Sequence, residues 1–561
     1  MIQIMRFMQK SMKLGRTGSS LMLFAVYRIV CLLSALRNRR GVNNMRCPDG
    51  KKANSILLAV YLSFVLISQI VVNTEHFIGP YLVIGSFLAV IISACAAPFL
   101  ISRFSALSLP DKGCGRTGGR MPRFCLYGIP LMILIFYYIA YYPGAFAVDS
   151  IDQYQQALTD QYNDWHPVLH TLIAFKLPML VSGGWVGSFA LFQILIFAVS
   201  LGYCFQTINQ YAGKGFTVAS MFFVLANPLT GNTAVFPWKD TAFAIGAMLL
   251  MTFSLQIFMT KGEWMTSWTH LAAFAAVFVV TTIVRHNAIL FTIPLLFAVL
   301  FQISPKRFLI LLLAIISLIC AIKGPLYKAL KVENPDKRQV ETLGLPMTII
   351  GAAVTYEPSK MDDEVLRFAY QVAPAEVWEK NYSYGNFNKV KWCSETDTDV
   401  IEDYGRERVI RMAFSCFKKA PSVCLKSLVK LTEGIYTITD PHPVSISPGI
   451  ARNTYGISFL SPEFLRYLPN TYNFFVQDLF PRIFLFYGVL HLVIVISALA
   501  KSSLSSVSDW KTLLFPLPMF LYNYGTSLLL TGNDDSPRFF FYSVLLFPIL
   551  LIFFYSEMRS E

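Results

Sequence analysis

Charged residues are scarce in this 561-residue chain. They make up 14% of it, whereas soluble domains carry roughly 25%. Hydrophobic residues account for 55% of the sequence, and the mean hydropathy is +0.52. A chain so poor in charge does not fold as a soluble globular protein. The composition therefore predicts an integral membrane protein.

Motifs for metal, nucleotide and repeat architectures are also lacking. The ten cysteines form no CxxC pair and no Cys/His spacing suited to zinc. There is no Walker motif, no internal repeat and no convincing inverted repeat. No cleavable signal peptide is evident, because the apolar segment 18–36 is too long for one. Cys393, Cys416 and Cys424 fall in a polar region, where a disulfide between two of them is an open question.

Acidic residues are nearly absent from the N-terminal part of the chain. Residues 1–52 hold eleven Lys or Arg and one acid, and the connector 103–123 holds five and one. These two segments, at +10 and +4, equal the whole formal net charge of +14. Basic residues beside membrane spans stay on the cytoplasmic side and attract anionic lipid. We therefore interpret the excess as a topology signal and not as a nucleic-acid site.

Long apolar runs predict helices that cross a bilayer. A spanning helix needs about 20 mostly apolar residues, because lipid offers no partner for backbone polar groups. We expect about twelve such helices, near 55–73, 79–101, 124–142, 185–206, 216–230, 240–260, 267–284, 288–303, 308–323, 483–500, 512–530 and 539–556. Segment 18–36 is a thirteenth candidate, which we interpret as a cytoplasmic or interfacial helix. The predicted fold class is an all-α polytopic membrane protein.

Alternation of the spans assigns the loops to two sides. With 103–123 inside, the other basic loops also fall inside, and the first loop 143–184 falls outside. The stretch 324–482, which carries nineteen of the 33 acids, also falls outside and is expected to be mainly helical. The predicted divisions are a basic segment 1–52, a transmembrane body 53–323, an extracytoplasmic domain 324–482 and C-terminal transmembrane helices 483–561. The expected location is a multi-pass position in the cell membrane.

The first outer loop concentrates polar side chains. Asp149, Asp152, Gln153, Gln156 and Asp160 recur at i+3 and i+4, which places carboxylates and amides on one helix face at the membrane surface. The structural alternative is that Asp149 caps the helix, an interaction worth about 1 kcal/mol. One residue can fill both roles.

Two histidines follow in the same loop. Trp165, His166 and Pro167 are expected to start a second short helix, with His166 and His170 four residues apart, the spacing of a metal-binding pair. Histidines beside proline are more often structural. With Asp149, His166 is a candidate ligand of a divalent metal ion, and the alternative is that His166 bonds a sugar hydroxyl or a phosphate.

Three later turns bring charged groups to the same predicted side. They carry Lys239 with Asp240, Arg285 with His286, and Arg538. A charge at mid-bilayer costs about 2.5 to 3.5 kcal/mol, but much less at a helix end, so interface anchoring is the alternative, strongest for Asp240. Positive residues usually gather inside. Their presence in three outer turns favours phosphate binding, for which arginine is suited.

Four segments resemble a known family. PGAFAVDSIDQYQQA at 143–157 and DWHPVLHT at 164–171, with FPWKDT at 236–241 and SPRFFFY at 536–542, resemble a bacterial branch of the GT-C superfamily of membrane glycosyltransferases. The first-loop acid, the paired surface helices, the multi-span body and the late outer domain agree with that organisation.

The resemblance implies a reaction and roles for these residues. The donor is then a sugar on a polyprenyl phosphate, and the acceptor is a glycan, lipid or protein hydroxyl outside the cytoplasm. Asp149 matches the family's first-loop acid and acts as general base or metal ligand, with Asp152 in place of the missing second acid of a DxD or DE motif. Lys239 and Arg538 are candidate phosphate ligands. The remaining candidates for catalysis or substrate binding are His166, Gln153, His170, Asp240, Arg285 and His286.

Two other function classes stay open at this point. A polytopic transporter or lipid-linked glycan flippase also needs many spans, and is expected to carry ionisable residues near helix centres or broken helices in matching halves. A non-catalytic assembly or receptor protein is expected to use the outer domain for binding. Polar groups gathered at outer helix ends favour the enzyme.

Overall fold

The structure is a computed structural model. It describes residues 52–74, 80–107, 121–333, 339–437, 446–478, 487–502, 511–530, 532–533 and 536–555. The expectation of an interfacial helix at 18–36 lies outside these residues. The described residues are helical with a few isolated β-bridges, so the all-α prediction is confirmed.

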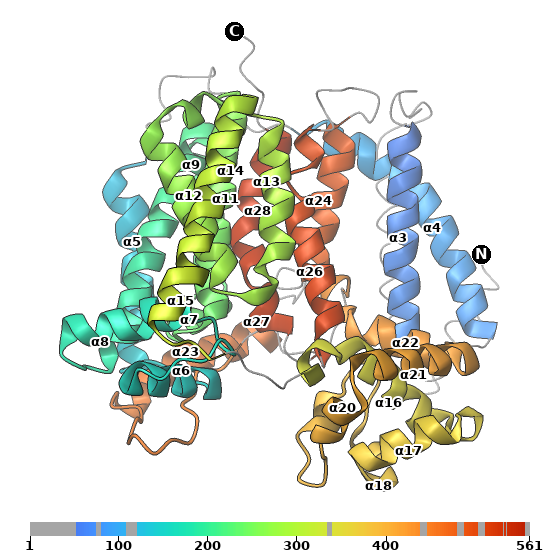
Figure 1. The fold of residues 1–561 in the computed structure, drawn as a ribbon. Coiled ribbons are helices and arrows are strands. Elements are labelled where there is room, and N and C mark those ends of the chain that lie inside the picture. Colours follow the sequence, from blue (N-terminus) through green and yellow to red (C-terminus); the bar gives the residue numbers. More distant parts are fainter. Residues whose placement is uncertain are drawn as a thin grey trace.

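A bundle of long apolar helices forms the body of the molecule (Figure 1). Its principal helices are α3 (Lys52–Asn73), α4 (Pro80–Ser105), α5 (Arg123–Ala140), α9 (Gly187–Leu225), α11 (Lys239–Met259), α12 (Trp268–Ile283), α13 (Ile289–Leu300), α14 (Pro305–Ala321), α24 (Tyr487–Lys501), α26 (Leu517–Leu529) and α28 (Tyr542–Tyr555). Among the described residues, seven helices are long and apolar enough to cross a membrane. Helices occupy every predicted span, and the count of twelve stays a prediction.

Helix α9 contains two of the predicted spans. Its chain reverses at Gly213, which has φ +79° and ψ 174° in place of helical angles. A positive φ favours glycine, because a Cβ would be strained there. The two arms of α9 therefore match the predicted spans 185–206 and 216–230. The second arm ends early, at Leu225.

The predicted turn 231–239 is partly wrong. Residues Pro228–Ala234 form a short helix, α10, whose N-cap Asn227 accepts a hydrogen bond from the Leu229 amide at 3.0 Å. Proline at the first helical position favours this start. Gly231 lies so close to Tyr137 of α5 that a Cβ would sit 2.2 Å from the ring. The sequence thus packs α10 against the body instead of leaving it as a loop.

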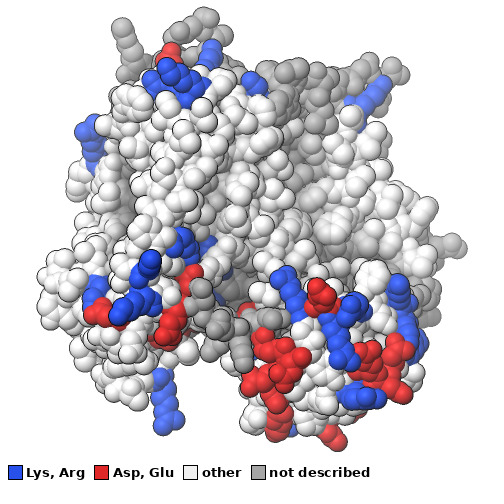
Figure 2. Space-filling model, viewed as in Figure 1, with Lys and Arg blue, Asp and Glu red and all other residues white. Residues whose placement is uncertain are grey.

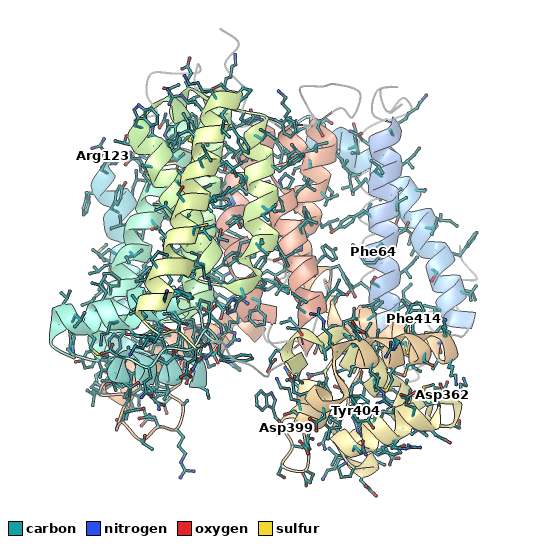
Figure 3. All side chains as sticks on the ribbon, viewed as in Figure 1. Phe64, Arg123, Asp362, Asp399, Tyr404 and Phe414 are labelled. Carbon is teal, nitrogen blue, oxygen red and sulfur yellow. The ribbon has the colours of Figure 1, made fainter. Side chains whose placement is uncertain are left out.

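On the face of the molecule seen in Figure 2, charged side chains lie mainly toward the two ends of the bundle. Lysines and arginines gather at the upper end with little red beside them, the middle of this face is largely uncharged, and both signs mix at the lower end. Figure 3 places Arg123, the first residue of α5, at the upper end. There Lys501 donates to the Ser105 carbonyl at 2.9 Å, and Arg307 donates to the Met265 carbonyl at 3.0 Å. The predicted basic loops therefore share one end, as the membrane interpretation requires.

Residues 344–431 form a domain, called the outer domain after its predicted side, that lies below one half of the bundle (Figure 1). Its helices are α16 (Gly344–Tyr356), α17 (Asp363–Val372), α18 (Ala375–Asn381), α19 (Asn388–Lys391), α20 (Asp399–Tyr404), α21 (Arg406–Lys419) and α22 (Pro421–Leu431). They enclose a separate core around Met347, Phe368 and Trp378. Figure 3 shows the labelled Asp362, Asp399 and Tyr404 away from the bundle.

The cysteine question receives an answer in this domain. Cys393, Cys416 and Cys424 are all free thiols. Burial raises the pKa of Cys416 and of Cys424 to about 12 in each case. These two thiols therefore behave as small apolar groups in the domain core.

The segment 446–478 packs away from that core. Ile450 pairs with Phe146 of the first loop, whose amide donates to the Gly449 carbonyl at 3.0 Å. Ile457 joins a buried cluster with Phe146 and Tyr154. Helix α23 (Glu463–Asp478) then lies at the ends of α5 and α10. The second part of the predicted domain thus covers the first loop.

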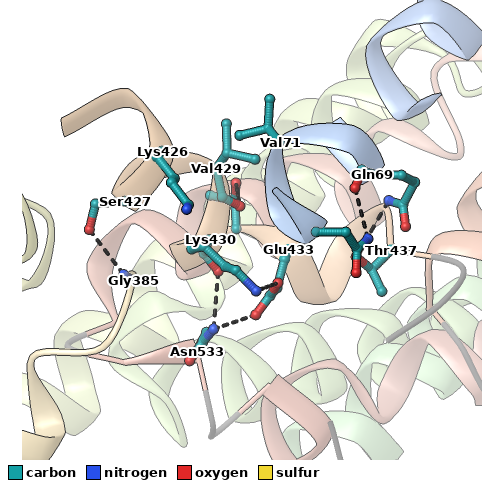
Figure 4. Close-up of polar contacts among 12 residues, drawn as sticks. Gln69, Val71, Gly385, Lys426, Ser427, Val429, Lys430, Glu433, Thr437 and Asn533 are labelled. Atoms are coloured by element: carbon teal, nitrogen blue, oxygen red, sulfur yellow. Dashed lines mark hydrogen bonds and ion pairs between the residues drawn. The ribbon is translucent and has the colours of Figure 1, made fainter. Parts of the chain in front are cut away.

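A buried polar joint connects the outer domain to the body (Figure 4). The Glu433 side chain is 1% exposed and pairs with Lys430 Nζ at 3.0 Å. Asn533 donates to a Glu433 carboxylate oxygen at 2.5 Å and to the Lys430 carbonyl at 3.2 Å. Gln69 of α3 donates to the Tyr436 carbonyl at 3.3 Å. The joint therefore ties α3 and the C-terminal turn to the end of α22.

We predict that Glu433→Ala lowers the free energy of unfolding by about 1 to 3 kcal/mol, because the buried Asn533 amide loses the carboxylate that accepts one of its hydrogen bonds and Lys430 loses its ion-pair partner. Thermal unfolding in detergent measures the loss. The matched control is Glu357→Ala, which breaks another i,i+3 ion pair, between Glu357 and Lys360 at 2.8 Å. The Glu357 side chain is 28% exposed. Exposed pairs are worth below about 1 kcal/mol. Equal effects of the two substitutions would contradict the assignment.

Candidate active site

Asp149 lies in the first turn of helix α6 (Val148–Thr159). Ala147 is the N-cap and makes no side-chain capping bond, so the interpretation of Asp149 as N-cap is wrong. A carboxylate in the first turn is still stabilised by the helix dipole. Asp160 also departs from the predicted face. It ends the helix with φ +56° and pairs with Lys176 at 2.6 Å.

Lys239 contacts two groups of the first loop. It is the first residue of α11, and its Nζ lies 3.4 Å from Asp149 Oδ2 and 2.9 Å from His166 Nδ1. The ammonium has no acceptor lone pair, so it donates to His166 and the imidazole carries its proton on Nε2. That nitrogen lies 3.4 Å from Asp152 Oδ2. Four predicted site residues thus form one connected row.

Arg538 joins this row to a third carboxylate, that of Asp240. It lies on α27 (Ser536–Phe540), with Nη1 3.7 Å from Asp149 Oδ2 and Nε 3.3 Å from Asp240 Oδ2. Its guanidinium also lies 4.7 Å from the ring centroid of Phe539 and 5.4 Å from that of Trp238. Aromatic faces attract guanidinium cations. Arg538 is therefore fixed by two acids and two rings.

Asp240 and Arg285 form a buried ion pair beneath the row. Their side chains are 3% and 6% exposed. Arg285 also donates to Asn287 Oδ1 at 2.6 Å and lies 4.4 Å from the Phe539 ring centroid. Buried charges need partners of this kind because their desolvation is costly. This pair fixes the starts of α11 and α13 with respect to α27.

Exposure increases from the buried pair toward the first loop. The side chains of Lys239, Arg538, Asp149 and Asp152 are 19%, 22%, 30% and 42% exposed. The buried pair therefore forms a floor, and the exposed groups face solvent. A ligand that enters from solvent therefore meets Asp149 together with the cations of Lys239 and Arg538.

Other predicted residues lie beside this network. Gln153 donates at 2.9 Å to His170 Nδ1 and at 3.0 Å to Thr171, and it is buried. It therefore holds α6 against α7 (Val168–Thr171). His286 donates from Nε2 to the Asp164 carbonyl at 3.0 Å, on the other side of the loop. Gln153, His170 and His286 therefore bond to partners other than Asp149.

The predicted histidine pair does not share a helix. Helix α7 begins at Val168, after Pro167, so His166 precedes it and the i, i+4 geometry is wrong. Lys239 Nζ occupies the place between Asp149 and His166 that the metal hypothesis assigns to a cation. Among the described residues, no group of three His, Cys, Asp or Glu side chains is arranged to hold a metal ion. In this conformation the ammonium supplies the positive charge.

Electrostatics keep Asp149 ionised and the histidines neutral. Burial opposes the charge on Asp149, but Lys239 and Arg538 prevail and lower its pKa to about 2. Burial, reinforced by Lys239, lowers the pKa of His166 and of His170 to about 3. A neutral His166 is the form that accepts the hydrogen bond from Lys239.

Sequence reasoning missed a second cluster around Asp164. Its carboxylate accepts from Lys323 at 2.7 Å and from Tyr327 at 3.1 Å. The Glu333 amide donates to the Tyr162 carbonyl at 2.9 Å nearby. These bonds attach the first loop to the end of α14. Asp164 directly precedes Trp165 and His166, and this position was the available signal.

Comparison of the chain with protein-family models, with curated proteins and with solved structures gave no match. The assignment of a function therefore depends on the geometry of the site and on the four sequence segments that meet there.

We predict that acid destabilises the protein below pH 6.5, the ordinary pKa of histidine. Below that pH His166 and His170 bind protons in the unfolded chain but stay unprotonated in the folded protein. The free energy of unfolding therefore falls as the pH falls toward 3. Each histidine contributes up to about 1.4 kcal/mol per pH unit. Melting temperatures at about pH 7.5 and about pH 5 measure the difference. His170→Asn should reduce it, and the control His270→Asn, at the opposite end of the bundle, should not.

Proposed function

We propose that this protein transfers a sugar from a polyprenyl-phosphate donor to a hydroxyl acceptor at the membrane surface. The observation that carries the proposal is the position of Asp149, partly exposed between Lys239 and Arg538. A carboxylate beside two cations fits a reaction in which a hydroxyl loses a proton while a phosphate leaves.

The reaction class is supported by the four segments that resemble GT-C glycosyltransferases. They supply Asp149, His166, Lys239 and Arg538, which are up to 389 positions apart in sequence and connect through direct contacts. Their convergence at one end of apolar helices favours a lipid-linked substrate.

The residues of the site divide the reaction between them. The acceptor oxygen forms a bond to the anomeric carbon and gives its proton to Asp149, while the bond from that carbon to the phosphate oxygen breaks. Lys239 and Arg538 stabilise the negative charge that grows on the departing polyprenyl phosphate. Asp240, paired with Arg285, holds Arg538 in place.

The low pKa of Asp149 fits this division. A pKa of about 2 makes a weak base while both cations are engaged with it. A phosphate that draws Lys239 and Arg538 toward itself removes that stabilisation and raises the pKa of Asp149. The base is thereby strengthened when the donor is bound. This coupling limits proton abstraction in the absence of substrate.

A divalent metal ion is the second means of stabilising the phosphate in this proposal. Asp149 and His166 are its proposed ligands, and Lys239 would have to move aside. Turnover measured with and without a chelator distinguishes the two. Unchanged turnover in chelator supports the ammonium and guanidinium, and loss of turnover supports the metal.

We expect Asp149→Asn to lower kcat on the order of 100- to 10,000-fold, because the amide does not accept a proton. The protein is reconstituted in liposomes with a panel of polyprenyl-phosphate sugars, and labelled product is counted. Asp160→Asn, which changes a surface acid at the end of the same helix, is the control and should retain activity. Full activity in Asp149→Asn would reject the assignment. Solute or lipid flux without turnover of any donor would favour the transporter.

Arg538→Lys should raise KM for the donor by about tenfold or more, since charged hydrogen bonds contribute about 1.5 to 3 kcal/mol. Lysine keeps the charge but loses the fork that reaches Asp149 and Asp240 together. The control is Arg466→Lys, at an arginine of α23 that donates to the Ser461 carbonyl at 2.8 Å. An unchanged KM for Arg538→Lys would remove Arg538 from the phosphate site.

A further inference from the structure

Helix α23 presents an inverted arrangement of side chains. Its asparagines bond to the body, where the Tyr141 hydroxyl donates to Asn470 Oδ1 at 2.7 Å and Asn232 donates to Asn473 Oδ1 at 3.1 Å. Asn473 is 5% exposed. Elsewhere on its surface the helix carries large apolar side chains that are 48% to 67% exposed and form what we call its aromatic face, namely Phe464, Tyr467, Leu468, Phe474 and Phe475. A helix surrounded by water normally has the reverse order.

The aromatic face adjoins the outer surfaces of two spans. Tyr472 of α23 donates from its hydroxyl to the Ala226 carbonyl at the end of α9. One turn earlier in α9, Phe222 is 75% exposed. On α5, Ile139 lies two residues before Tyr141 and is 52% exposed. The exposed apolar side chains of the two spans therefore adjoin those of α23.

Helix α8 (Leu177–Ser182) shows the same property on the other side of α6. Leu180 and Val181 are 69% and 81% exposed, and Trp185 follows at 43%. Helices α8, α6 and α23 lie at one level, where the bundle ends (Figure 1). Contiguous apolar surface of this kind marks a contact with lipid or protein. Aromatic residues at the ends of spans are typical of the bilayer interface.

We infer that α23 lies in the membrane interface on the site side, with its aromatic face against lipid. The occupant is the bilayer and not a second protein, because the face is continuous with the lipid-facing sides of α5 and α9. An amphipathic helix binds an interface through its buried apolar area. With α8 on the other side, the surface helix that carries Asp149 is held at the level of the lipid headgroups. This inference does not depend on the reaction proposed above.

Photochemical cross-linking in liposomes tests the inference. A photoreactive phenylalanine replaces Phe474 in the full-length chain, in vesicles of phosphatidylethanolamine and phosphatidylglycerol. The matched control replaces Trp392, an aromatic residue of the outer domain that is 75% exposed. After irradiation, mass spectrometry counts lipid adducts. We expect adducts at position 474 to exceed those at 392 several-fold.

Two results would overturn the inference. Equal lipid adducts at both positions would place α23 in water, and cross-links from 474 to a second copy of the chain would make the face a protein interface. Placement of the probe at position 467, seven residues earlier on the same helix, repeats the measurement. A melting temperature equal to that of the unmodified protein shows that each labelled chain is folded.

Discussion

The buried pair of Asp240 and Arg285 is the interaction on which the site depends. It lies where α11 and α13 begin, and Arg538 extends it to Asp149. In a low dielectric medium, each of these charges is tolerable only with its partners present. Removal of one leaves an uncompensated charge at the ends of several helices. Ion pairs therefore hold together chain segments that are far apart in sequence. Apolar contacts between helices do not by themselves fix which of these helix ends meet.

The sequence was sufficient to predict the helical class and the grouping of basic loops at one end. The length of an apolar run and the charge of a loop can be read from a single segment. Both predict its position because lipid accepts apolar helices and water accepts charged loops, whatever the rest of the chain does. The structure also brings three of the candidate residues, Asp149, Lys239 and Arg538, close together. Charged side chains near a membrane need oppositely charged partners, and the helix ends are where such partners can be reached.

Local details were less predictable for physical reasons. Asp149 is not the N-cap because the helix begins earlier than expected, after Ala147, which packs against the hydrophobic core of the body. The expected histidine pair separates because Pro167 ends one segment and His166 contacts Lys239 from α11. The apolar face of α23 lies in a stretch that composition marks as polar, since its asparagines and prolines dominate the local signal. Each case turns on a tertiary partner far away in the chain.

The charge balance of the site is compatible with the lipid phosphate of the proposed reaction. Lys239, Arg285 and Arg538 balance Asp149, Asp152 and Asp240, while His166 is neutral. A phosphate diester adds one negative charge to this neutral group, and the least costly compensation is a proton on the most exposed acid near the cations. Asp149, at 30% exposed, meets that description better than buried Asp240. In the proposed reaction the acceptor hydroxyl supplies this proton, so binding of the anion and activation of the hydroxyl are two results of one electrostatic balance.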